Sequence, residues 1–471
     1  MKRRRWDVSS TSRVRFISGR AAGSSEEDGD IARFGNFRRF AALFAVLIAA
    51  TPAMAQRLPL LRGAGSVLPT IGSLPVEVIS ETRQTLDAGR QNLDTGLSTD
   101  LRLVRQRDLV RANPKTLDTD DHGAPVVRGE VLTLSPTPRS LEIAMADGFK
   151  VARRESLAPL DLEEVVLSPP TGLSVREAVR RLRKLDPQGQ YDFDHVYSPS
   201  AAVATSTTAA VAMGGERAPA WVRVGLLDTG FSRDDPVFAG GVIEQQAFAP
   251  GGVTAGPHGT AVASLMVGAT ERFHGAAPGA RLYAADVYGS GPAGGSADAI
   301  VHALAWMARN SVPVINVSLV GPPNLTLEAA VRAVNARGEV IVAPVGNDGP
   351  AAPPLYPAAY PGVVAVTAVD RRGRVIFEAG LGRHVDFAAP GADMVAAKPG
   401  GGLAVVRGTS FASPIVAGRL ALLLRAPGPA DAARALAQLA AEAKRPAGVD
   451  AARLGHGVIG EDIRLDPRAS R

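Results

Sequence analysis

The chain has 471 residues, of which 46% are hydrophobic and 21% charged, ordinary values for a globular protein with a sizeable core. It contains no cysteine, which excludes a disulfide framework, a thiolate metal site and a cysteine nucleophile. The formal net charge is +6, but residues 1–40 alone hold ten Lys and Arg against five Asp and Glu, a net +5. Because a nucleic-acid-binding protein concentrates basic charge on its folded domain, nucleic acid is not expected as a partner.

An apolar run follows the basic leader. Residues 40–50 (FAALFAVLIAA) come directly after two arginines, and Ala53 and Ala55 then give the small-x-small pattern of a cleavage site. We interpret residues 1–55 as a signal peptide with a long basic n-region, so the protein is expected to be secreted or periplasmic. A single anchoring helix is the alternative, but this run is short for a span of about 20 residues. No stable membrane span is expected after cleavage.

Three segments precede the largest apolar block. Residues 56–128 are polar with sparse apolar spacing, which favours a peripheral helical or mobile extension. Residues 129–197 follow the order βαββαβ, typical of a ferredoxin-like α+β domain. Residues 198–218 are small and polar, as in an exposed linker. In the small domain, strands are expected at 130–134, 150–157, 162–167 and 191–197, and helices at 138–147 and 174–185.

The last and largest domain is expected over residues 219–471, and within it residues 219–426 alternate near-continuous apolar runs with helical patterns. This alternation is typical of a mainly parallel sheet with helices on both faces, so the fold class is α/β. In such sheets, functional groups gather at the carboxyl ends of the strands. The expected strands are 222–228, 281–288, 313–319, 340–344, 363–368 and 385–388, and the expected helices are 259–267, 296–310, 325–336 and 411–424.

Four polar residues stand at the ends of these elements. Asp228 ends the apolar run VRVGLLD, and His258 lies in GPHGTAVAS at the start of a helix. Asn347 follows the strand VIVAPVG, and Ser410 lies in RGTSFASPIVAG at the head of a helix. Each alone is commonly a cap or turn residue. Together they supply the carboxylate, imidazole, hydroxyl and amide donor that acyl transfer requires.

The sequence around these residues resembles the subtilase (subtilisin-like) serine endopeptidases. The likeness rests on VGLLDTG, HGTAVAS, INVSL, VAPVGNDG, YPAAYPGVVAVTAVD, FAAPG and GTSFASPIVAG, in the family's order over residues 220–426. It implies a subtilisin-like fold in which Asp228 orients the imidazole of His258, the general base and acid. It further implies that Ser410 attacks the peptide carbonyl while Asn347 and the Ser410 N–H hold the oxyanion.

The resemblance also implies a polypeptide substrate, bound as an added strand between two edges. Because Leu355 stands where common relatives carry a small residue, we expect a shallow primary pocket that favours small residues on the acyl side of the scissile bond. A cis peptide is expected at Tyr356–Pro357. The residues expected to line the two edges and the pocket are Gly289, Ser290, Gly291, Ser318, Leu319, Val320, Val345, Gly346 and Leu355.

Subtilases are commonly made with a small upstream domain that assists folding, caps the active site and is cut away by the enzyme. Residues 129–197 are therefore expected to be a propeptide and an intramolecular inhibitor, with the cut between residues 197 and 218. No cofactor is expected. No metal is assigned, because the stretch GATERFHGAAPGA is short and lacks the Asn-rich calcium loop of many relatives. The remaining histidines, His302 among them, are interpreted as structural.

The alternatives have less support. A second Asp-Thr-Gly at Asp94 would fit an aspartic protease, but a polar stretch precedes it where an apolar strand is needed. The glycine-rich run 289–294 matches a dinucleotide fingerprint, but Pro292 lies within its tight turn. The main alternative is a catalytically silent subtilase-fold binding protein. Such a protein would usually lack one of the four residues, and none is missing here.

Overall fold

The computed structural model of the chain describes residues 102–200, 202–208, 217–271, 273–446 and 448–465. The interpreted signal peptide lies outside these residues. In this described part of the chain, no helix is long and apolar enough to cross a membrane.

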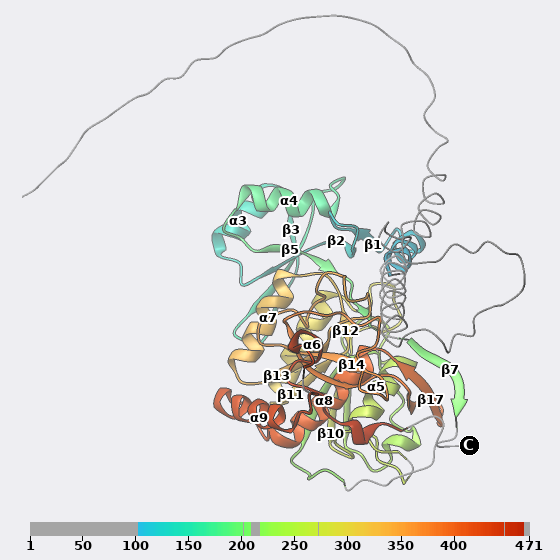
Figure 1. The fold of residues 1–471 in the computed structure, drawn as a ribbon. Coiled ribbons are helices and arrows are strands. Elements are labelled where there is room, and N and C mark those ends of the chain that lie inside the picture. The colour runs from blue at the N-terminus through green and yellow to red at the C-terminus, as the bar shows by residue number, and fades with distance from the viewer. Residues whose placement is uncertain (1–101, 201, 209–216, 272, 447, 466–471) are drawn as a thin grey trace, which may run out of the picture. The chain divides into compact units, whose positions relative to one another are not determined.

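Seven parallel strands form the sheet of the larger domain, in the order β15-β14-β13-β11-β8-β10-β9. Figure 1 labels β10, β11, β13 and β14 of this sheet. The strands are nearly continuous apolar runs because both faces of the sheet are covered. The edge strand β9 alternates between partly buried and exposed residues, and its sequence IEQQA is too polar for the pattern predicted above. The strands are β8 (Arg223–Asp228), β9 (Ile243–Ala247), β10 (Arg281–Asp286), β11 (Val314–Val317), β13 (Val340–Pro344), β14 (Val364–Val369) and β15 (Val385–Pro390).

Helices cover both faces of this sheet. Neighbouring residues of β8 point to opposite sides: Leu226 belongs to a buried cluster with α5 and α8, and Leu227 to one with α6 and α7. This two-sided cover confirms the predicted α/β architecture. The helices are α5 (Pro257–Val267), α6 (Ala297–Arg309), α7 (Leu325–Ala336), α8 (Thr409–Leu423) and α9 (Pro429–Glu442). Shorter elements are η2 (Pro236–Phe238), β12 (Leu319–Val320), β16 (Met394–Ala397), β17 (Leu403–Arg407), α10 (Ala451–Leu454) and η3 (Glu461–Ile463).

The small domain is an antiparallel sheet with two helices. Its strand order is β3-β4-β2-β5, the ferredoxin-like order expected for a βαββαβ unit, and β1 adds to the start of β2. Val131 and Val165 lie in the domain's own core, whereas their neighbours Leu132 and Val166 belong to a cluster of the larger domain. The elements are β1 (Leu117–Thr119), β2 (Pro125–Leu134), α3 (Pro138–Ala146), β3 (Lys150–Ser156), β4 (Glu163–Ser168), α4 (Val175–Leu185) and β5 (Tyr191–His195).

The boundaries of this domain differ from those expected from sequence. β1 and the first residues of β2 precede residue 129, so the folded unit begins earlier than the apolar pattern indicates. The expected linker also contains two strands, β6 (Ser198–Pro199) and β7 (Ala202–Thr208). They form by pairing with β12 and β17 of the larger domain, which a composition of small polar residues does not reveal.

The free face of the small sheet packs on α6 and α7. Leu132, Leu157 and Val166 share a buried cluster with Ile300 and Leu304 of α6. Apolar burial contributes roughly 25 cal/mol per Å² removed from water, so this shared cluster favours the docked arrangement.

Two carboxylates of β5 meet the N-termini of the docking helices. Asp192 Oδ2 accepts from Leu325 N at 2.7 Å, and Asp194 Oδ1 accepts from Asp298 N at 3.0 Å. The first turn of a helix leaves N–H groups unpaired and carries the positive end of the helix dipole. Acceptors from the small domain therefore stabilise α6 and α7 while they hold that domain in place.

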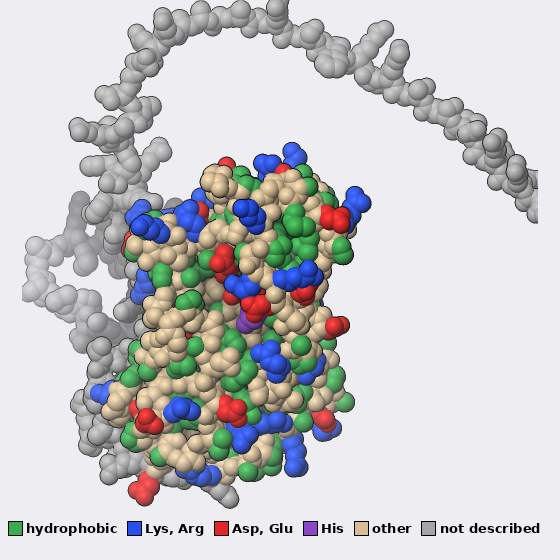
Figure 2. Space-filling view, turned by 180° about the vertical axis from the view of Figure 1, so that it is seen from behind, with side chains coloured by type: hydrophobic (Ala, Val, Ile, Leu, Met, Phe, Trp, Pro, Cys, Tyr) green, Lys and Arg blue, Asp and Glu red, His purple; other side chains and the backbone are tan. Residues whose placement is uncertain are grey.

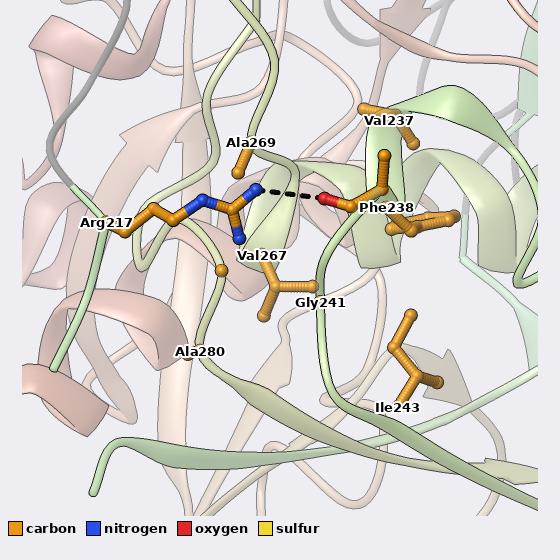
Figure 3. A pocket seen from close by; sticks show the side chains of 10 residues that line it. Arg217, Val237, Phe238, Gly241, Ile243, Val267, Ala269 and Ala280 are labelled. Carbon is orange, nitrogen blue, oxygen red and sulfur yellow. Dashed lines mark hydrogen bonds between the residues drawn. The ribbon is translucent and has the colours of Figure 1, made fainter. Parts of the chain in front are cut away.

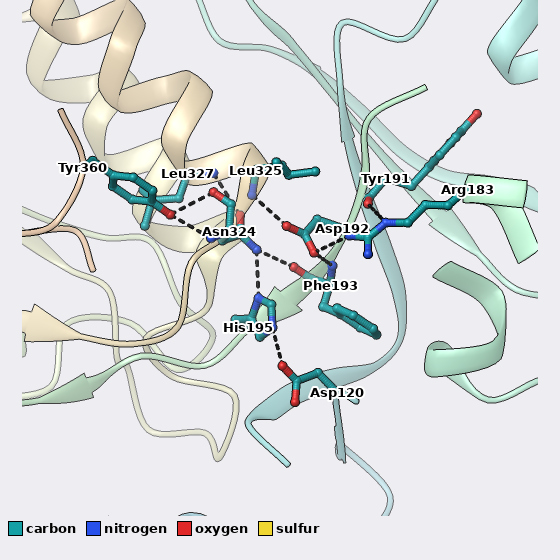
Figure 4. A network of polar contacts seen from close by, with 10 residues as sticks. All are labelled: Asp120, Arg183, Tyr191, Asp192, Phe193, His195, Asn324, Leu325, Leu327 and Tyr360. Atoms are coloured by element: carbon teal, nitrogen blue, oxygen red, sulfur yellow. Dashed lines mark hydrogen bonds and ion pairs between the residues drawn. The ribbon is translucent and has the colours of Figure 1, made fainter. Parts of the chain in front are cut away.

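Asn324 lies at the centre of the polar contacts between β5 and α7 (Figure 4). Its side-chain oxygen accepts from Leu327 N at 2.9 Å and so caps α7. Its Nδ2 donates to Phe193 O at 2.8 Å and lies 3.0 Å from His195 Nδ1. Because His195 Nδ1 accepts there, its Nε2 is the nitrogen that donates to Asp120 Oδ2, 3.2 Å away.

Replacing Asn324 by Ala should lower the free energy of unfolding by about 2–4 kcal/mol, because it removes a helix cap and leaves a buried carbonyl unpaired. Urea unfolding of the full chain in a Ser410→Ala background, which lacks the predicted nucleophile, would measure this. Ser174→Ala is the matched control, since Ser174 caps the exposed start of α4; it should cost about 1 kcal/mol. An Asn324→Ala effect no larger than the control would contradict a role in docking.

Candidate active site

The imidazole of His258 is paired with the carboxylate of Asp228. Asp228 is the last residue of β8 and is fully buried, and His258 is the second residue of α5 and is 6% exposed. His258 Nδ1 lies 2.9 Å from Oδ1 and 2.8 Å from Oδ2 of Asp228. A carboxylate in this position accepts the Nδ1–H, which leaves Nε2 as the ring nitrogen able to take a proton.

The end of β8 and the start of α5 approach each other closely. Gly259 N donates to Thr229 Oγ1 at 3.0 Å, and Gly256 N donates to Gly230 O at 2.8 Å. A Cβ atom at Gly259 would lie only 2.2 Å from Thr229 O. The glycine that follows His258 is therefore required for steric reasons, because a larger residue would push α5 and its histidine away from Asp228.

Asn347 and Ser410 lie next to each other at the start of α8. Ser410 is the second residue of that helix and is fully buried. Thr409 N donates to Asn347 Oδ1 at 3.0 Å, which fixes the amide so that Nδ2 is its remaining donor. Nδ2 is buried and has no hydrogen-bond partner among the described residues. Unpaired buried donors are costly, so this one marks a place where an external acceptor can bind.

His258 also lies at the start of α8, but its ring is not hydrogen-bonded to Ser410. The ring centroid of His258 is 5.5 Å from that of Phe411, the next residue after Ser410. His258 Nε2 is buried without a hydrogen-bond partner in the described part of the chain. The hydroxyl of Ser410 instead contacts the hydroxyl of Ser200. The four predicted catalytic residues thus lie beyond the carboxyl ends of the interior strands β8 and β13, and the hydroxyl of Ser410 contacts that of Ser200.

The chain that leaves the small domain runs through this site. β6 pairs antiparallel with β12, with Pro199 opposite Leu319 and Ser198 opposite Val320. Ser200, the next residue, is buried with its hydroxyl against Ser410. After it, β7 pairs with β17, the strand that ends three residues before Ser410. The segment is therefore held by backbone pairing on both sides of the predicted nucleophile.

Tyr197, three residues before Ser200 in the chain, buries its side chain beside Gly321. It is fully buried, its N–H donates to Gly295 O at 2.8 Å, and its hydroxyl donates to Pro322 O at 2.8 Å. A Cβ atom at Gly321 would lie 2.4 Å from the tyrosine ring. Glycine at position 321 therefore makes the space that the ring occupies.

Of the two edges predicted to bind substrate, residues 318–320 and 289–291, the structure places the first against β6. Leu319 and Val320 pair with β6, and Ser318 Oγ donates to Ser410 O at 3.3 Å, so this edge lies at the site.

The other predicted edge, residues 289–291, lies against residues 250 and 251. A Cβ atom at Gly289 would be 2.2 Å from Pro250 O, and one at Gly251 would be 2.0 Å from Ser290 Oγ. The edge that contacts the segment is instead Gly295, whose carbonyl accepts from Tyr197 N, and Ser296, which forms a bridge with Val196. Sequence analysis missed this second edge. The sequence feature that could have indicated this edge is the pair Gly294-Gly295, directly before Ser296, the N-cap of α6.

The predicted primary pocket is closed at one point by Leu355. Val345 and Leu355 are buried, and a Cβ atom at Gly346 would lie 2.5 Å from Leu355 Cδ1. Gly346 has φ +93°, a conformation that L side chains rarely adopt. The peptide between Tyr356 and Pro357 is cis, as predicted. That these residues contact substrate stays a prediction.

Two other surface features lie apart from these residues. A small pocket beside η2 is lined by Arg217, whose guanidinium donates to Ala239 O at 2.9 Å, and by apolar residues such as Phe238 and Ile243 (Figure 3). Asp228, His258 and Ser410 are not among its lining residues. Figure 2 shows acidic and basic side chains interspersed over one face of the molecule.

Comparisons with known proteins agree with this geometry. The model of the subtilase family matches residues 221–457. Over 209 residues the chain is 37% identical to subtilisin Savinase of Lederbergia lenta, covering 43% of this chain and 76% of that protein. It is equally identical to an alkaline protease of Alkalihalobacillus alcalophilus, of which it spans 53%. The crystal structure of fervidolysin from Fervidobacterium pennivorans has a similar fold, with a TM-score of 0.59, 21% identity, and coverage of 72% of this chain and 61% of that one. The chain therefore belongs to the subtilase family of serine endopeptidases.

Proposed function

We propose that the chain is a secreted or periplasmic serine endopeptidase, made as a precursor that it cleaves itself. The observation that carries this proposal is the buried Asp228–His258 pair beside the start of α8, where Ser410 contacts the segment that leaves the small domain. Secretion rests on the signal peptide interpreted from residues 1–55, which lies outside the described residues.

In the proposed reaction, Ser410 Oγ attacks the carbonyl carbon of the scissile peptide and its proton passes to His258 Nε2. Asp228 stabilises the imidazolium that forms. The carbonyl oxygen becomes an oxyanion that accepts from Asn347 Nδ2 and the Ser410 N–H. His258 then gives its proton to the leaving amine as the C–N bond breaks, which leaves the acyl–Ser410 ester. A water deprotonated by His258 attacks this ester, and the proton returns from His258 to Ser410 Oγ as the C–O bond breaks. Asn347 Nδ2 and His258 Nε2, two buried nitrogens without a hydrogen-bond partner among the described residues, both act in this proposed reaction.

We infer that the precursor is cut directly after Ser200. β6 pairs with β12 up to Pro199, and the hydroxyl of the next residue, Ser200, contacts that of Ser410. We therefore expect the bond after Ser200 to be the one that Ser410 attacks. Serine on the acyl side suits the shallow pocket expected from Leu355. Tyr197, by contrast, occupies the pocket beside Gly321 and need not fit the primary one. Until the cut product leaves, β6 covers the β12 edge, so the small domain acts as an intramolecular inhibitor.

Ser410→Ala should remove both peptide hydrolysis and precursor processing, with kcat lowered by about 10⁶-fold. Asn347→Leu should lower kcat by about 10²–10³-fold and leave KM nearly unchanged, because the lost donor acts on the oxyanion and not on bound substrate. Rates on an unstructured polypeptide and gel analysis of the precursor measure these effects. Ser413→Ala, one turn further along α8, is the matched control and should remain active. Self-processing by purified Ser410→Ala protein would refute the assignment.

The mature protein should begin with Ala201, which N-terminal sequencing or intact mass would show. Ser200→Phe should slow processing by at least tenfold, because the ring does not fit a pocket closed by Leu355. Ser198→Ala, whose position pairs only through its backbone, should be processed normally. A mature N-terminus elsewhere in residues 198–218, unaffected by Ser200→Phe, would contradict the inferred bond while leaving the proposed catalysis intact.

A further inference from the structure

A second cluster of reactive side chains lies where the small domain meets α6, away from the proposed catalytic residues. Glu164 comes from β4 of the small domain, and Asp298 and His302 lie one turn apart on α6. One donor atom from each residue lies within 4.8 Å of the other two. His302 Nε2 is 2.8 Å from Glu164 Oε2 and 3.9 Å from Asp298 Oδ1. The three residues thus present an imidazole nitrogen and two carboxylate oxygens to a common point.

Glu164 supplies an independent sign that a ligand belongs there. Its side chain is 1% exposed, and its Oε1 is buried with no hydrogen-bond partner among the described residues. A buried carboxylate oxygen without a donor is costly, since carboxylates are almost never fully buried unless paired. The second oxygen of the same carboxylate is satisfied by His302. Burial and the neighbouring Asp298 carboxylate raise the pKa of Glu164 to about 10, so a cation that binds here takes the place of a proton.

The charges around the cluster leave an excess of carboxylates. Arg153 of β3 contacts Asp298 Oδ1 and lies 3.2 Å from Glu155 Oε1. Asp194 of β5 is buried and accepts from Asp298 N. Glu130 of β2 also faces Asp298 and Arg153. The carboxylates that face this point therefore outnumber Arg153, so one guanidinium does not balance them.

The second ring nitrogen of His302 also faces a carboxylate. His302 Nδ1 lies 3.7 Å from Glu155 Oε2. Histidines that bind a metal through one nitrogen usually direct the other toward a carboxylate or carbonyl, which fixes the ring and raises its basicity. His302 and Asp298 are each about one-fifth exposed, so an ion and a water ligand could reach them.

We propose that Glu164, Asp298 and His302 form a binding site for a divalent first-row transition metal ion, with Zn²⁺ as its simplest occupant. A mixed imidazole and carboxylate donor set suits such ions better than Ca²⁺ or Mg²⁺, which prefer oxygen alone. Around tetrahedral Zn²⁺ neighbouring donor atoms lie about 3.4 Å apart, and the two histidine–carboxylate distances bracket that value. Three protein ligands leave the fourth position to water.

The site joins two domains, so an ion there would hold the small domain on α6. The ion binds all three residues only when the small domain is docked, with Glu164 facing Asp298 and His302. A ligand that binds the docked state alone stabilises that state. The inference goes beyond the proposed peptidase activity, because it depends on the docked small domain and not on the catalytic residues.

The test uses the full chain with Ser410→Ala, purified without a polyhistidine tag and stripped of metal with a chelator. Titration calorimetry with Zn²⁺ and native mass spectrometry should give one ion per chain, and Co²⁺ should produce visible absorption typical of low coordination number. The thermal unfolding midpoint should rise with Zn²⁺. Because activity is not measured, failure here and failure of the proposed catalysis are distinguishable.

Two variants locate the site. His302→Ala and Glu164→Gln should each weaken Zn²⁺ binding by at least tenfold, since even outer partners of metal ligands are worth that much. His122→Ala, which removes an exposed histidine of the small domain, is the matched control and should bind like the parent. Circular dichroism and the metal-free unfolding midpoint check that the variants fold. Unchanged Zn²⁺ affinity in both ligand variants would overturn the proposal. So would a parent chain that binds no Zn²⁺ tightly, which would mean that protons neutralise the cluster.

Discussion

The bond between Asp228 and His258 is the interaction on which the site depends. It joins the end of the interior strand β8 to the start of α5, and both partners are buried. The bond requires α5 to approach the strand so closely that Gly259 has no room for a side chain. With Nδ1 paired to the carboxylate, Nε2 is the ring nitrogen left to take a proton, and the ring lies beside Phe411 at the start of α8. The parallel sheet also places Asn347, which follows the carboxyl end of β13. Ser410 comes from the start of α8, which follows β17 of a separate antiparallel sheet.

The small domain is tied to the larger one by three kinds of contact. Apolar residues of its sheet complete a core that α6 and α7 begin, and the carboxylates of Asp192 and Asp194 satisfy the first N–H groups of those helices. The segment after β5 then adds a strand to the β12 edge. Each contact uses main-chain groups or apolar area that the larger domain leaves open. The same docking gathers several carboxylates around His302, and the inferred metal site arises from that crowding.

Docking also explains why the serine hydroxyl does not point to the histidine. Ser410 meets Ser200 of the segment that passes through the site, and His258 Nε2 has no partner among the described residues. The segment that ends at Ser200 thus lies directly against the predicted nucleophile. In the proposed precursor, the segment is both substrate and inhibitor, held by pairing on each side of the bond to be cut.

Much of the site could be predicted from sequence because its parts are local. An apolar strand ending in Asp228, a His-Gly pair opening a helix and a Gly-Thr-Ser sequence at the start of α8 are each encoded within a few residues. A parallel sheet brings the carboxyl ends of its strands to the same side. The two strands within residues 198–208 could not be predicted, because their pairing partners lie more than a hundred residues away and their own composition is that of a linker. For the same reason residues 289–291 could be mistaken for the edge that Gly295 forms. The sequence by itself determined which chemical groups are present and the order of the elements that carry them. Only the tertiary structure decided which backbone edges meet the segment and which carboxylates surround His302, because those contacts join residues far apart in the chain.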